Sequence, residues 1–160
     1  MLFLCENNLY AMGTPIAQEL ARTDISARAE SYGMVAEAVD GMDVLAVEAA
    51  ARTAAAAVRS GAGPRLLELR TYRYRAHSMA DPDLYRTKEE IQGWKQRDPT
   101  ALLERILRQE GALSDEQHES LEAEIAAELD AAIAVADAGP LEPIEDLLRD
   151  VHTPVGEGAP

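Results

Sequence analysis

Short apolar runs and stretches of helical periodicity alternate along the first 72 residues. Three runs bounded by polar or turn residues predict strands, and they span residues 2–5, 35–39 and 65–72. Two stretches between them predict helices, one over residues 25–32 before Gly33 and one over residues 44–59 behind the N-cap residue Asp43. The order strand, helix, strand, helix, strand predicts parallel βαβ units, so we expect an α/β fold with a parallel sheet and flanking helices.

Residues 87–160 show helical patterns only. Four helices are predicted from the N-cap residues or prolines at their starts, which are Thr87 with Glu90, Asp98 with Pro99, Ser114 with Gln117, and Pro143. The third helix repeats an apolar residue at every fourth position from Leu121 to Ile133, which predicts a packed face opposite a solvated acidic face. A Gly-Pro pair at 139–140 ends that helix, the last one runs to Val151, and the tail from His152 is expected to fray.

The loop at 74–85 separates the two patterns, because it shows neither helical nor strand periodicity. We therefore divide the chain into an α/β part over residues 1–86 and a helical C-terminal region over residues 87–160. Three strands make a small sheet, and the apolar run at 2–5 would leave an unpaired strand edge. The pattern alone therefore favours a chain that is part of a longer protein.

The composition is that of a globular protein, with 47% hydrophobic and 28% charged residues. No apolar run approaches the length of a membrane span, and a net charge of −14 argues against nucleic acid and anionic membranes as partners. The charge is uneven, since residues 113–160 hold thirteen acidic residues and one basic residue, whereas the segment from Arg70 to Arg86 is basic. The single cysteine, Cys5, excludes an internal disulfide, and we expect a buried, unreactive thiol and a cytoplasmic location.

An Asn-Asn pair follows the first predicted strand. In parallel sheets, ligands bind at the carboxyl ends of the strands, and amide and carbonyl oxygens suit Mg²⁺. Asn8 could therefore offer its side-chain oxygen, and Tyr10 its backbone carbonyl, to a metal ion. The same residues also fit a polar turn without a ligand, and their spacing alone favours that interpretation. Thr14 and Pro15 then predict the start of a short helical turn.

The loop after the third predicted strand holds a second group of candidates. His77 follows Arg73 and Arg75 in this loop, and we expect it at the same edge of the sheet as Asn8. An imidazole can hydrogen-bond a phosphate or transfer a proton, and arginine pairs with phosphates, although spacing alone favours a surface histidine. A serine-hydrolase site at His77 and Ser78 is not favoured, because adjacent residues rarely adopt triad geometry.

Both segments resemble one family, the α subunit of the pyruvate dehydrogenase decarboxylating component. Residues 5–14, Cys-Glu-Asn-Asn-Leu-Tyr-Ala-Met-Gly-Thr, resemble the closing half of its thiamin-diphosphate motif. Residues 72–82, Tyr-Arg-Tyr-Arg-Ala-His-Ser-Met-Ala-Asp-Pro, resemble its active-site loop. The resemblance implies the C-terminal part of a thiamin-diphosphate-binding fold followed by a helical tail. It also implies that Asn8 and the Tyr10 carbonyl bind Mg²⁺ and thereby the cofactor, whereas the Gly-Asp-Gly that opens the motif is absent from this sequence.

The active-site loop carries further implications. The resemblance implies that His77 contacts the cofactor diphosphate and acts in catalysis, with Arg73 beside it at the diphosphate. Ser78 stands at the position that mitochondrial members phosphorylate. Arg75 and Ala76 precede His77 where mitochondrial members have His-Gly, and the segment after the loop lacks their second serine. The resemblance is therefore to bacterial members, and kinase control is not expected.

The activity implied by the resemblance is oxidative decarboxylation of pyruvate with thiamin diphosphate and Mg²⁺, followed by acetyl transfer to the lipoyl group of dihydrolipoyl acyltransferase. The implied partners are that lipoylated acyltransferase and a β subunit in an α2β2 assembly. Because the β subunit and the opening half of the motif supply other essential groups in the family, we expect the isolated 160 residues to be inactive.

Two other functions are compatible with the sequence. An acetoin dehydrogenase α subunit has a similar active-site loop. A non-catalytic assembly or interaction remnant would keep the acidic helices, but it would need neither Asn8 nor His77. A phosphate-binding regulatory module is disfavoured, because the sequence has no Gly-rich phosphate loop.

Overall fold

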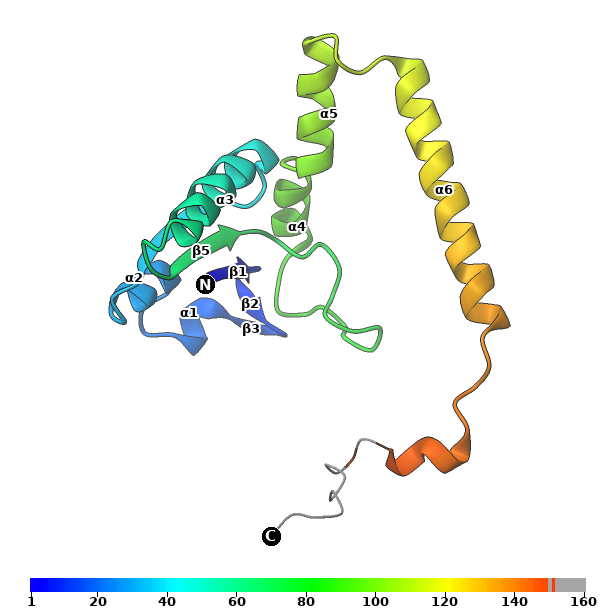
Figure 1. Ribbon diagram of the computed structural model, residues 1–160, viewed down its shortest axis with the longest axis horizontal. Helices are drawn as coiled ribbons and strands as arrows, with labels where there is room; N and C mark the ends of the chain where they lie inside the picture. Colours follow the sequence, from blue (N-terminus) through cyan, green and yellow to red (C-terminus); the bar gives the residue numbers. More distant parts are fainter. Residues whose placement is uncertain (150, 152–160) are drawn as a thin grey trace. The chain divides into compact units, whose positions relative to one another are not determined.

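The computed structural model describes residues 1–149 and residue 151 (Figure 1). Contacts between residues divide the chain into two units, residues 1–112 and residues 113–160. The predicted fraying of the tail from His152 lies outside the described residues.

A three-stranded parallel sheet is the framework of the first unit. Its strands are β1 (Leu2–Asn7), β4 (Val35–Asp40) and β5 (Arg65–Arg70), in the order β1-β5-β4. Helix α2 (Ile25–Glu30) lies in the connection from β1 to β4, and α3 (Val44–Arg59) lies in the connection from β4 to β5. The parallel βαβ order expected from the sequence is therefore confirmed, and the last strand lies in the middle.

Helix α3 packs on one face of this sheet (Figure 1). Asp43 caps its N-terminus, because the Asp43 carboxylate accepts hydrogen bonds from two backbone amides. The core between helix and sheet consists of four buried side chains, which are Val39, Ala50, Ala54 and Leu67. The two alanines let the helix approach the sheet closely. Burial of a leucine such as Leu67 stabilises the fold by ~2 kcal/mol relative to its exposure.

The opposite face of β5 buries a polar group. Glu68, next to Leu67 in the strand, has no exposed surface, and Asn7 at the end of β1 is buried beside it. The Asn7 side chain donates a hydrogen bond to the Glu68 carboxylate at 2.8 Å. Helix α2 contributes the backbone amide of Ser26, 3.3 Å from the other carboxylate oxygen. The sequence predicted this strand but gave no sign of a fully buried carboxylate.

A small hairpin follows β1. Strand β2 (Tyr10–Ala11) pairs antiparallel with β3 (Thr14–Pro15), and the single-turn helix α1 (Ile16–Glu19) comes directly after it. The sequence predicted that both residues of β3 begin a helical turn. That prediction is wrong by two residues, because both pair with β2 and the helix begins only after them. The hairpin turn places Met12 at φ 56°, where glycine or asparagine is the usual signal of such a turn.

The loop between β5 and α4 (Lys88–Lys95) contains neither helix nor strand, as expected. Thr87 caps α4 by accepting a hydrogen bond from the Glu90 amide. The predicted capping box is incomplete, however, because the Glu90 carboxylate accepts hydrogen bonds from two tyrosines outside the helix. Helix α5 (Pro99–Gln109) begins at its predicted Asp-Pro start. Contacts place α4 and α5 in the same unit as the sheet, while the division of the sequence at residue 86 stays a prediction.

The second unit contains α6 (Asp115–Ala138) and the short 3-10 helix η1 (Ile144–Leu148) among its described residues. The predicted capping box of Ser114 and Gln117 is present at the start of α6. The predicted helix over residues 143–151 is wrong in type and length. Its backbone hydrogen bonds join residues three apart, from Asp146 to Pro143 and from Arg149 to Asp146, a pattern that is common in short helical pieces.

The apolar stripe of α6 is uncovered within the described residues of the second unit. Its side chains are between 49% and 59% exposed, and they are Leu121, Ile125, Leu129 and Ile133. The other described residues of the second unit do not cover this stripe, and the expected packing of this face stays a prediction. Neither α6 nor another described helix combines the length and apolar content that crossing a bilayer requires.

Candidate functional site

The two segments singled out in the sequence line one cavity at the carboxyl end of the sheet. The cavity has a volume of about 280 Å³. Its lining residues come from the segment after β1 and from the loop after β5, and they include Asn8, Tyr10, Arg73, Arg75, His77 and Arg86. The expectation that Asn8 and His77 lie at the same edge of the sheet is therefore confirmed.

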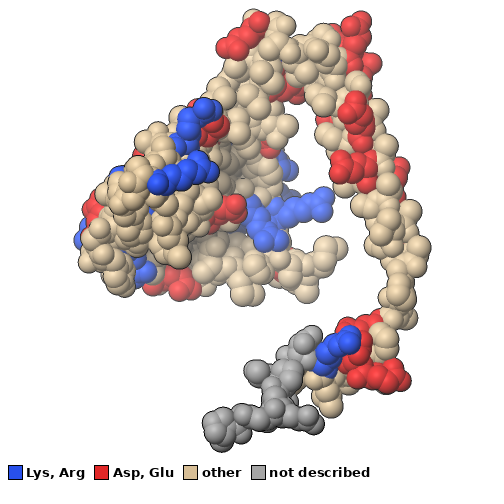
Figure 2. Space-filling view, viewed as in Figure 1, with Lys and Arg blue, Asp and Glu red and all other residues tan. Residues whose placement is uncertain are grey.

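The cavity is a basic region of an acidic chain. Three arginines line it, whereas the whole chain has a net charge of −14. Basic side chains gather beside the loop that follows β5, and acidic side chains lie along α6 (Figure 2). A cavity with this lining attracts anions such as phosphates.

Hydrogen bonds set the geometry of the segment after β1. The Asn7 Oδ1 atom accepts a hydrogen bond from the Leu9 amide at 3.0 Å, which closes an Asx-turn. Leu9 has φ 68°, a conformation that is costly for a residue other than glycine unless contacts hold it. The Leu9 carbonyl accepts a hydrogen bond from the Ile16 amide at 2.9 Å. Both peptide groups of Leu9 are therefore fixed, and Asn8 is presented at the cavity.

The hairpin leaves the Tyr10 carbonyl available for a ligand. The bond from Ile16 to Leu9 marks these two residues as a hydrogen-bonded pair of the antiparallel ladder. Bonded and non-bonded pairs alternate in such a ladder, so the neighbouring pair of Tyr10 and Pro15 is non-bonded. Pro15 also has no amide hydrogen to donate. The Tyr10 carbonyl, which is the predicted ligand, therefore accepts no hydrogen bond from β3.

The side-chain oxygen of Asn8 is oriented by the residue that follows β5. It accepts a hydrogen bond from the Thr71 hydroxyl at 2.9 Å, and the Thr71 amide donates to the Asn7 carbonyl at 3.0 Å. A carboxamide oxygen has two lone pairs, so this bond orients Asn8 and leaves one lone pair for a metal ion. Gly41 makes room for Thr71, because a Cβ atom on Gly41 would lie 2.5 Å from the Thr71 methyl group.

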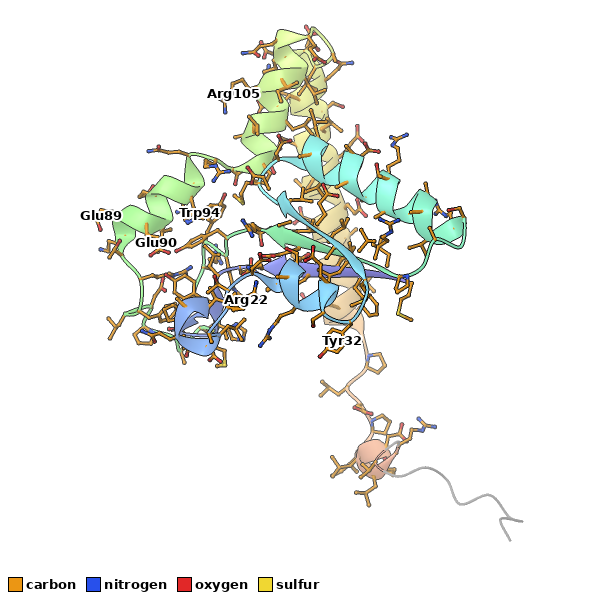
Figure 3. The ribbon with its side chains drawn as sticks, turned by 90° about the vertical axis from the view of Figure 1, so that its left-hand side faces the viewer. Arg22, Tyr32, Glu89, Glu90, Trp94 and Arg105 are labelled. Atoms are coloured by element: carbon orange, nitrogen blue, oxygen red, sulfur yellow. The ribbon has the colours of Figure 1, made fainter. Side chains whose placement is uncertain are left out.

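Glu90 of α4 joins both segments that line the cavity. One carboxylate oxygen of Glu90 accepts hydrogen bonds from the hydroxyls of Tyr10, at 2.8 Å, and Tyr72, at 2.9 Å. Trp94 stacks on the Tyr72 ring with centroids 5.1 Å apart, and Figure 3 shows Glu90 and Trp94 on the side of α4 that faces the sheet. Burial and the hydrogen bond to Glu90 raise the pKa of Tyr10 to about 12. The Tyr10 hydroxyl therefore remains a donor at neutral pH.

Asp81 closes the tip of the loop after β5. Its carboxylate accepts hydrogen bonds from the Asp83 amide and the Tyr85 hydroxyl, both at 2.9 Å, and from the His77 amide at 3.2 Å. These bonds, chiefly that from the Asp83 amide, lower the pKa of Asp81. The Tyr85 ring lies against Gly13 of the hairpin, where a Cβ atom would come within 3.1 Å of it. The loop therefore packs directly on the segment that carries Asn8.

Arg86 holds the base of the same loop, and the sequence gave no sign of this function. Its side chain is 3% exposed and forms an ion pair with Asp83 at 2.6 Å. The guanidinium group also donates to the carbonyls of Arg73 and Tyr74, and it lies 5.3 Å from the centre of the Tyr72 ring. The hydrogen bonds to Asp83 raise the pKa of Arg86. A single buried cation thus crosslinks the loop with its own backbone.

His77 lines two cavities that share lining residues. The second cavity has a volume of about 570 Å³, and Ser78 lines it together with His77. Both side chains are exposed. The His77 carbonyl accepts a hydrogen bond from Arg73 Nη2 at 3.1 Å, so Arg73 also braces the loop. The structure thus brings Asn8, Tyr10, Arg73 and His77 together, and their roles toward a cofactor stay predictions.

The residues at the first cavity fit a magnesium ion. Among the described residues, His, Cys, Asp and Glu side chains form no group of three that could hold a metal ion. Mg²⁺ is usually held by few protein oxygens, with waters and phosphate oxygens completing its shell. Asn8 and Tyr10 both line this cavity, and the Asn8 side chain and the Tyr10 carbonyl are the two oxygens that would hold the ion.

Cys5 is half-buried rather than buried as predicted. Burial and the neighbouring carboxylates of Glu68 and Glu6 raise the pKa of the Cys5 thiol. A thiol with a raised pKa is a poor nucleophile at neutral pH, so the expected lack of reactivity has a physical basis.

The model of the dehydrogenase E1 component family matches residues 1–145, which include both segments that line the cavity. The chain belongs to the dehydrogenase E1 component family. This membership confirms the family that the two motifs indicated, and the parallel sheet with flanking helices confirms the expected fold class.

Several curated proteins of the dehydrogenase E1 component family are similar to this chain. The mitochondrial pyruvate dehydrogenase E1 component subunit alpha of Sminthopsis macroura is 43% identical over 154 residues, which cover 95% of this chain and 42% of that protein. The subunit alpha of Rhizobium meliloti (strain 1021) is 38% identical over 152 residues, which cover 94% and 44%. The somatic mitochondrial form of Homo sapiens is 43% identical over 154 residues, which cover 95% and 39%. The chain thus spans about two fifths of the length of these relatives.

Proposed function

We propose that this chain is part of the α subunit of a pyruvate dehydrogenase E1 component, which decarboxylates pyruvate oxidatively with thiamin diphosphate and Mg²⁺. Family membership and the names of the relatives support the proposal. The observation that carries it beyond similarity is the single cavity at which Asn8 and Tyr10 meet Arg73 and His77.

The cavity has the donors that a diphosphate bound through Mg²⁺ requires. Asn8 and the Tyr10 carbonyl offer hard oxygens to the metal ion. Arg73 and Arg75 offer positive charge and N–H donors to phosphate oxygens. Thiamin diphosphate, when bound, supplies the electron sink that stabilises the carbanion left by decarboxylation.

The contribution of this chain is to orient groups and to supply charge. The Thr71 hydroxyl orients the Asn8 oxygen. Hydrogen bonds to the Leu9 amide and carbonyl fix the backbone that leads to Tyr10. His77 lies in a loop that Asp81 braces, where its imidazole can donate a hydrogen bond to a phosphate oxygen or exchange a proton with the reacting molecule. Preorganised groups of this kind need no rearrangement at the moment of reaction.

We also propose that the subunit acts in the cytoplasm, with a β subunit in an α2β2 assembly, and passes its acetyl group to a lipoylated dihydrolipoyl acyltransferase. The words "subunit alpha" and "component" in the names of the relatives support a partner subunit and a larger complex. Groups that this chain lacks, such as the aspartate of the Gly-Asp-Gly half-motif, would come from other parts of that assembly.

Two alternatives are less well supported. An acetoin dehydrogenase subunit would share the fold and both motifs, but the curated relatives described above are named for pyruvate. A non-catalytic interaction remnant would not require Asn8 and His77 at one cavity. The turnover rates of pyruvate and of acetoin are compared in the native protein that contains this chain. A preference for pyruvate distinguishes the proposed function from the first alternative.

Substitution of Asn8 tests the proposed metal site. Thiamin-diphosphate affinity is measured by calorimetry across a range of Mg²⁺ concentrations, in the native protein that contains this chain. Because the loss of an outer-shell partner alone weakens metal binding ~10-fold or more, Asn8→Ala should weaken it at least as much. Asn8→Asp keeps an oxygen ligand and should retain binding, as should the control Tyr32→Phe at an 82% exposed position. Unchanged affinity in Asn8→Ala would exclude the metal assignment.

A further inference from the structure

Glu68 is a buried carboxylate to which the proposed function assigns no role. By the exposure of the whole residue, Glu68 and Asn7 are the buried polar residues among those described, and Glu68 is 0% exposed. Moving a carboxylate out of water is costly unless hydrogen bonds compensate, and apolar residues of similar volume often replace buried ions without loss of stability. Packing alone therefore does not account for a glutamate in the central strand.

Three donors surround the Glu68 carboxylate. Asn7 Nδ2 lies 2.8 Å from Oε1, Arg70 Nε lies 3.2 Å from the same oxygen, and the Ser26 amide lies 3.3 Å from Oε2. The Arg70 side chain is 52% exposed, whereas the bond from Asn7 is buried and the shortest of the three. The bond from Asn7 is therefore the contact of this carboxylate that is best shielded from solvent.

The bond to Glu68 determines which way the Asn7 carboxamide points. Its Nδ2 atom faces the Glu68 carboxylate, so its Oδ1 atom faces the Leu9 amide and accepts a hydrogen bond at 3.0 Å. A flipped carboxamide would set oxygen against oxygen at Glu68 and N–H against N–H at Leu9, because a carboxylate only accepts and an amide nitrogen only donates. Glu68 thus selects the orientation in which Asn7 closes the turn.

That turn controls both predicted metal ligands. Leu9, which the Asn7 bond holds at φ 68°, lies between Asn8 and Tyr10. A change in its backbone conformation would redirect both the Asn8 side chain and the Tyr10 carbonyl. Mg²⁺ demands near-ideal octahedral geometry, so a small displacement of these oxygens weakens its binding.

We propose that Glu68 is a positioning residue, which acts through Asn7 to hold the two oxygen ligands and thereby sets the affinity for Mg²⁺ with thiamin diphosphate. This inference rests on the proposed function, because it concerns the same metal site. Hydrogen bonds that orient metal ligands typically change affinity 10- to 100-fold, so their loss here should weaken binding ~10-fold.

The experiment compares variants that separate positioning from stability. Mg²⁺-dependent binding of thiamin diphosphate is measured by calorimetry, and thermal unfolding without ligand is measured beside it, in the native protein that contains this chain. Glu68→Ala removes the anchor, whereas Glu68→Gln keeps an acceptor for Asn7. Asn7→Ser keeps an oxygen for the turn but is too short to reach Glu68. Leu67→Ala is the matched control, because Leu67 is the neighbouring buried residue on the opposite face of β5.

The expected result is ~10-fold weaker binding in Glu68→Ala and Asn7→Ser, with Glu68→Gln within about threefold of wild type because its side chain still accepts from Asn7. Leu67→Ala should unfold at a lower temperature and bind normally. If Glu68→Ala does not fold, Asn7→Ser gives the same test. Equal affinities in Asn7→Ser and wild type, or an affinity loss in Leu67→Ala as large as in the Glu68 and Asn7 variants, would overturn the inference alone. Wild-type protein that binds no thiamin diphosphate would overturn the proposed function and the inference with it.

Discussion

The two segments that line the first cavity are held by different kinds of contact. Residues 7–16 are tied to the sheet by a buried side-chain bond to Glu68 and by backbone bonds to neighbouring residues. Residues 73–86 are tied mainly to each other, through the hydrogen bonds of Asp81 and Arg86. The first arrangement suits rigid ligands of a metal ion, because its geometry is fixed by the core. The second suits a loop that carries exposed reactive groups, because it depends little on the core for its own shape.

Glu90 joins the two segments by hydrogen bonds, and the Tyr85 ring joins them by packing on Gly13 and Tyr10. The Glu90 carboxylate accepts from Tyr10 in one segment and from Tyr72 at the start of the other. A substitution that acts on one segment and leaves both of these contacts in place should therefore leave the other segment largely intact.

Removal of the Arg86 guanidinium should give the largest effect, and it should fall on residues 73–86. Arg86→Ala leaves the partly buried Asp83 carboxylate and two carbonyls without their partner. Loss of one member of a buried ion pair costs ~3 kcal/mol. We therefore expect the free energy of unfolding, measured with denaturant, to fall by this amount. Hydrogen exchange should become faster in residues 73–86 and stay unchanged in residues 7–16.

The control for Arg86 is Arg52 of α3, which pairs with Glu48 on the helix surface with side chains 78% and 55% exposed. Exposed pairs of this kind contribute ~0.5 kcal/mol or less, so Arg52→Ala should change stability little. An Arg86→Ala protein as stable as Arg52→Ala would show that the loop does not depend on its buried cation.

Substitution of Gly41 should give the next largest effect, and it should reach the other segment. A Cβ atom at this position would lie 2.5 Å from the Thr71 methyl group and 2.9 Å from the Arg70 carbonyl. Gly41→Ala must therefore displace Thr71 and its hydrogen bond to Asn8. We expect a destabilisation of ~2 kcal/mol from this overpacking, together with weaker binding of Mg²⁺ in the calorimetric assay.

Two further variants sharpen the test of Gly41. Gly93 in α4 has open space around its Cβ position, so Gly93→Ala should stabilise the helix by ~0.5–1 kcal/mol. Thr71→Ser removes the methyl group but keeps the hydroxyl, and it should recover part of the stability lost in Gly41→Ala. A Gly41→Ala protein that behaves like Gly93→Ala would contradict the proposed close packing.

The sequence predicted what depends on local patterns. Helix α3 has the predicted residues, because Asp43 caps it and its apolar positions recur at helical spacing. The three strands lie where apolar runs indicated them, and each is within two residues of its predicted bounds. The family resemblance added which residues should meet at the edge of the sheet, and the shared cavity agrees with it.

The contacts that shape the site could not be predicted, because they join residues far apart in the chain. The sequence placed Glu68 in a strand without indicating its burial, which depends on Asn7 and on α2. Glu90 looked like the third residue of a capping box, yet its carboxylate binds Tyr10, 80 residues earlier. Long-range partners such as these follow from the packed fold and leave no periodic signal in the sequence.

The smallest expected effects are pH-dependent, and Tyr10 of one segment and Asp81 of the other act at opposite ends of the pH scale. The pKa of Tyr10 is raised from 10 to about 12 by burial and by Glu90, so the folded protein binds this proton more tightly than the unfolded chain. The stabilisation from Tyr10 is therefore complete below pH 10 and is lost as the pH rises through 12. The pKa of Asp81 is lowered from 3.8, first by the Asp83 amide. The stabilisation from Asp81 is present above pH 3.8 and is lost as the pH falls through the lower, folded-state pKa.

Both effects are tested by thermal unfolding across the pH scale, in the native protein that contains this chain. Tyr10→Phe removes the hydroxyl that titrates at high pH, and it should flatten the loss of stability between pH 10 and pH 12. Asp81→Asn removes the acidic group and should flatten the loss of stability below pH 3.8. Because the Asp81 carboxylate also raises the pKa of Tyr85, this variant should change the alkaline loss as well. The acid effect should be the smaller of the two, because the Asp81 carboxylate lies at the tip of an exposed loop and solvent screens it. If Tyr10→Phe altered the loss of stability in acid, the two segments would be coupled more tightly than their separate hydrogen bonds imply.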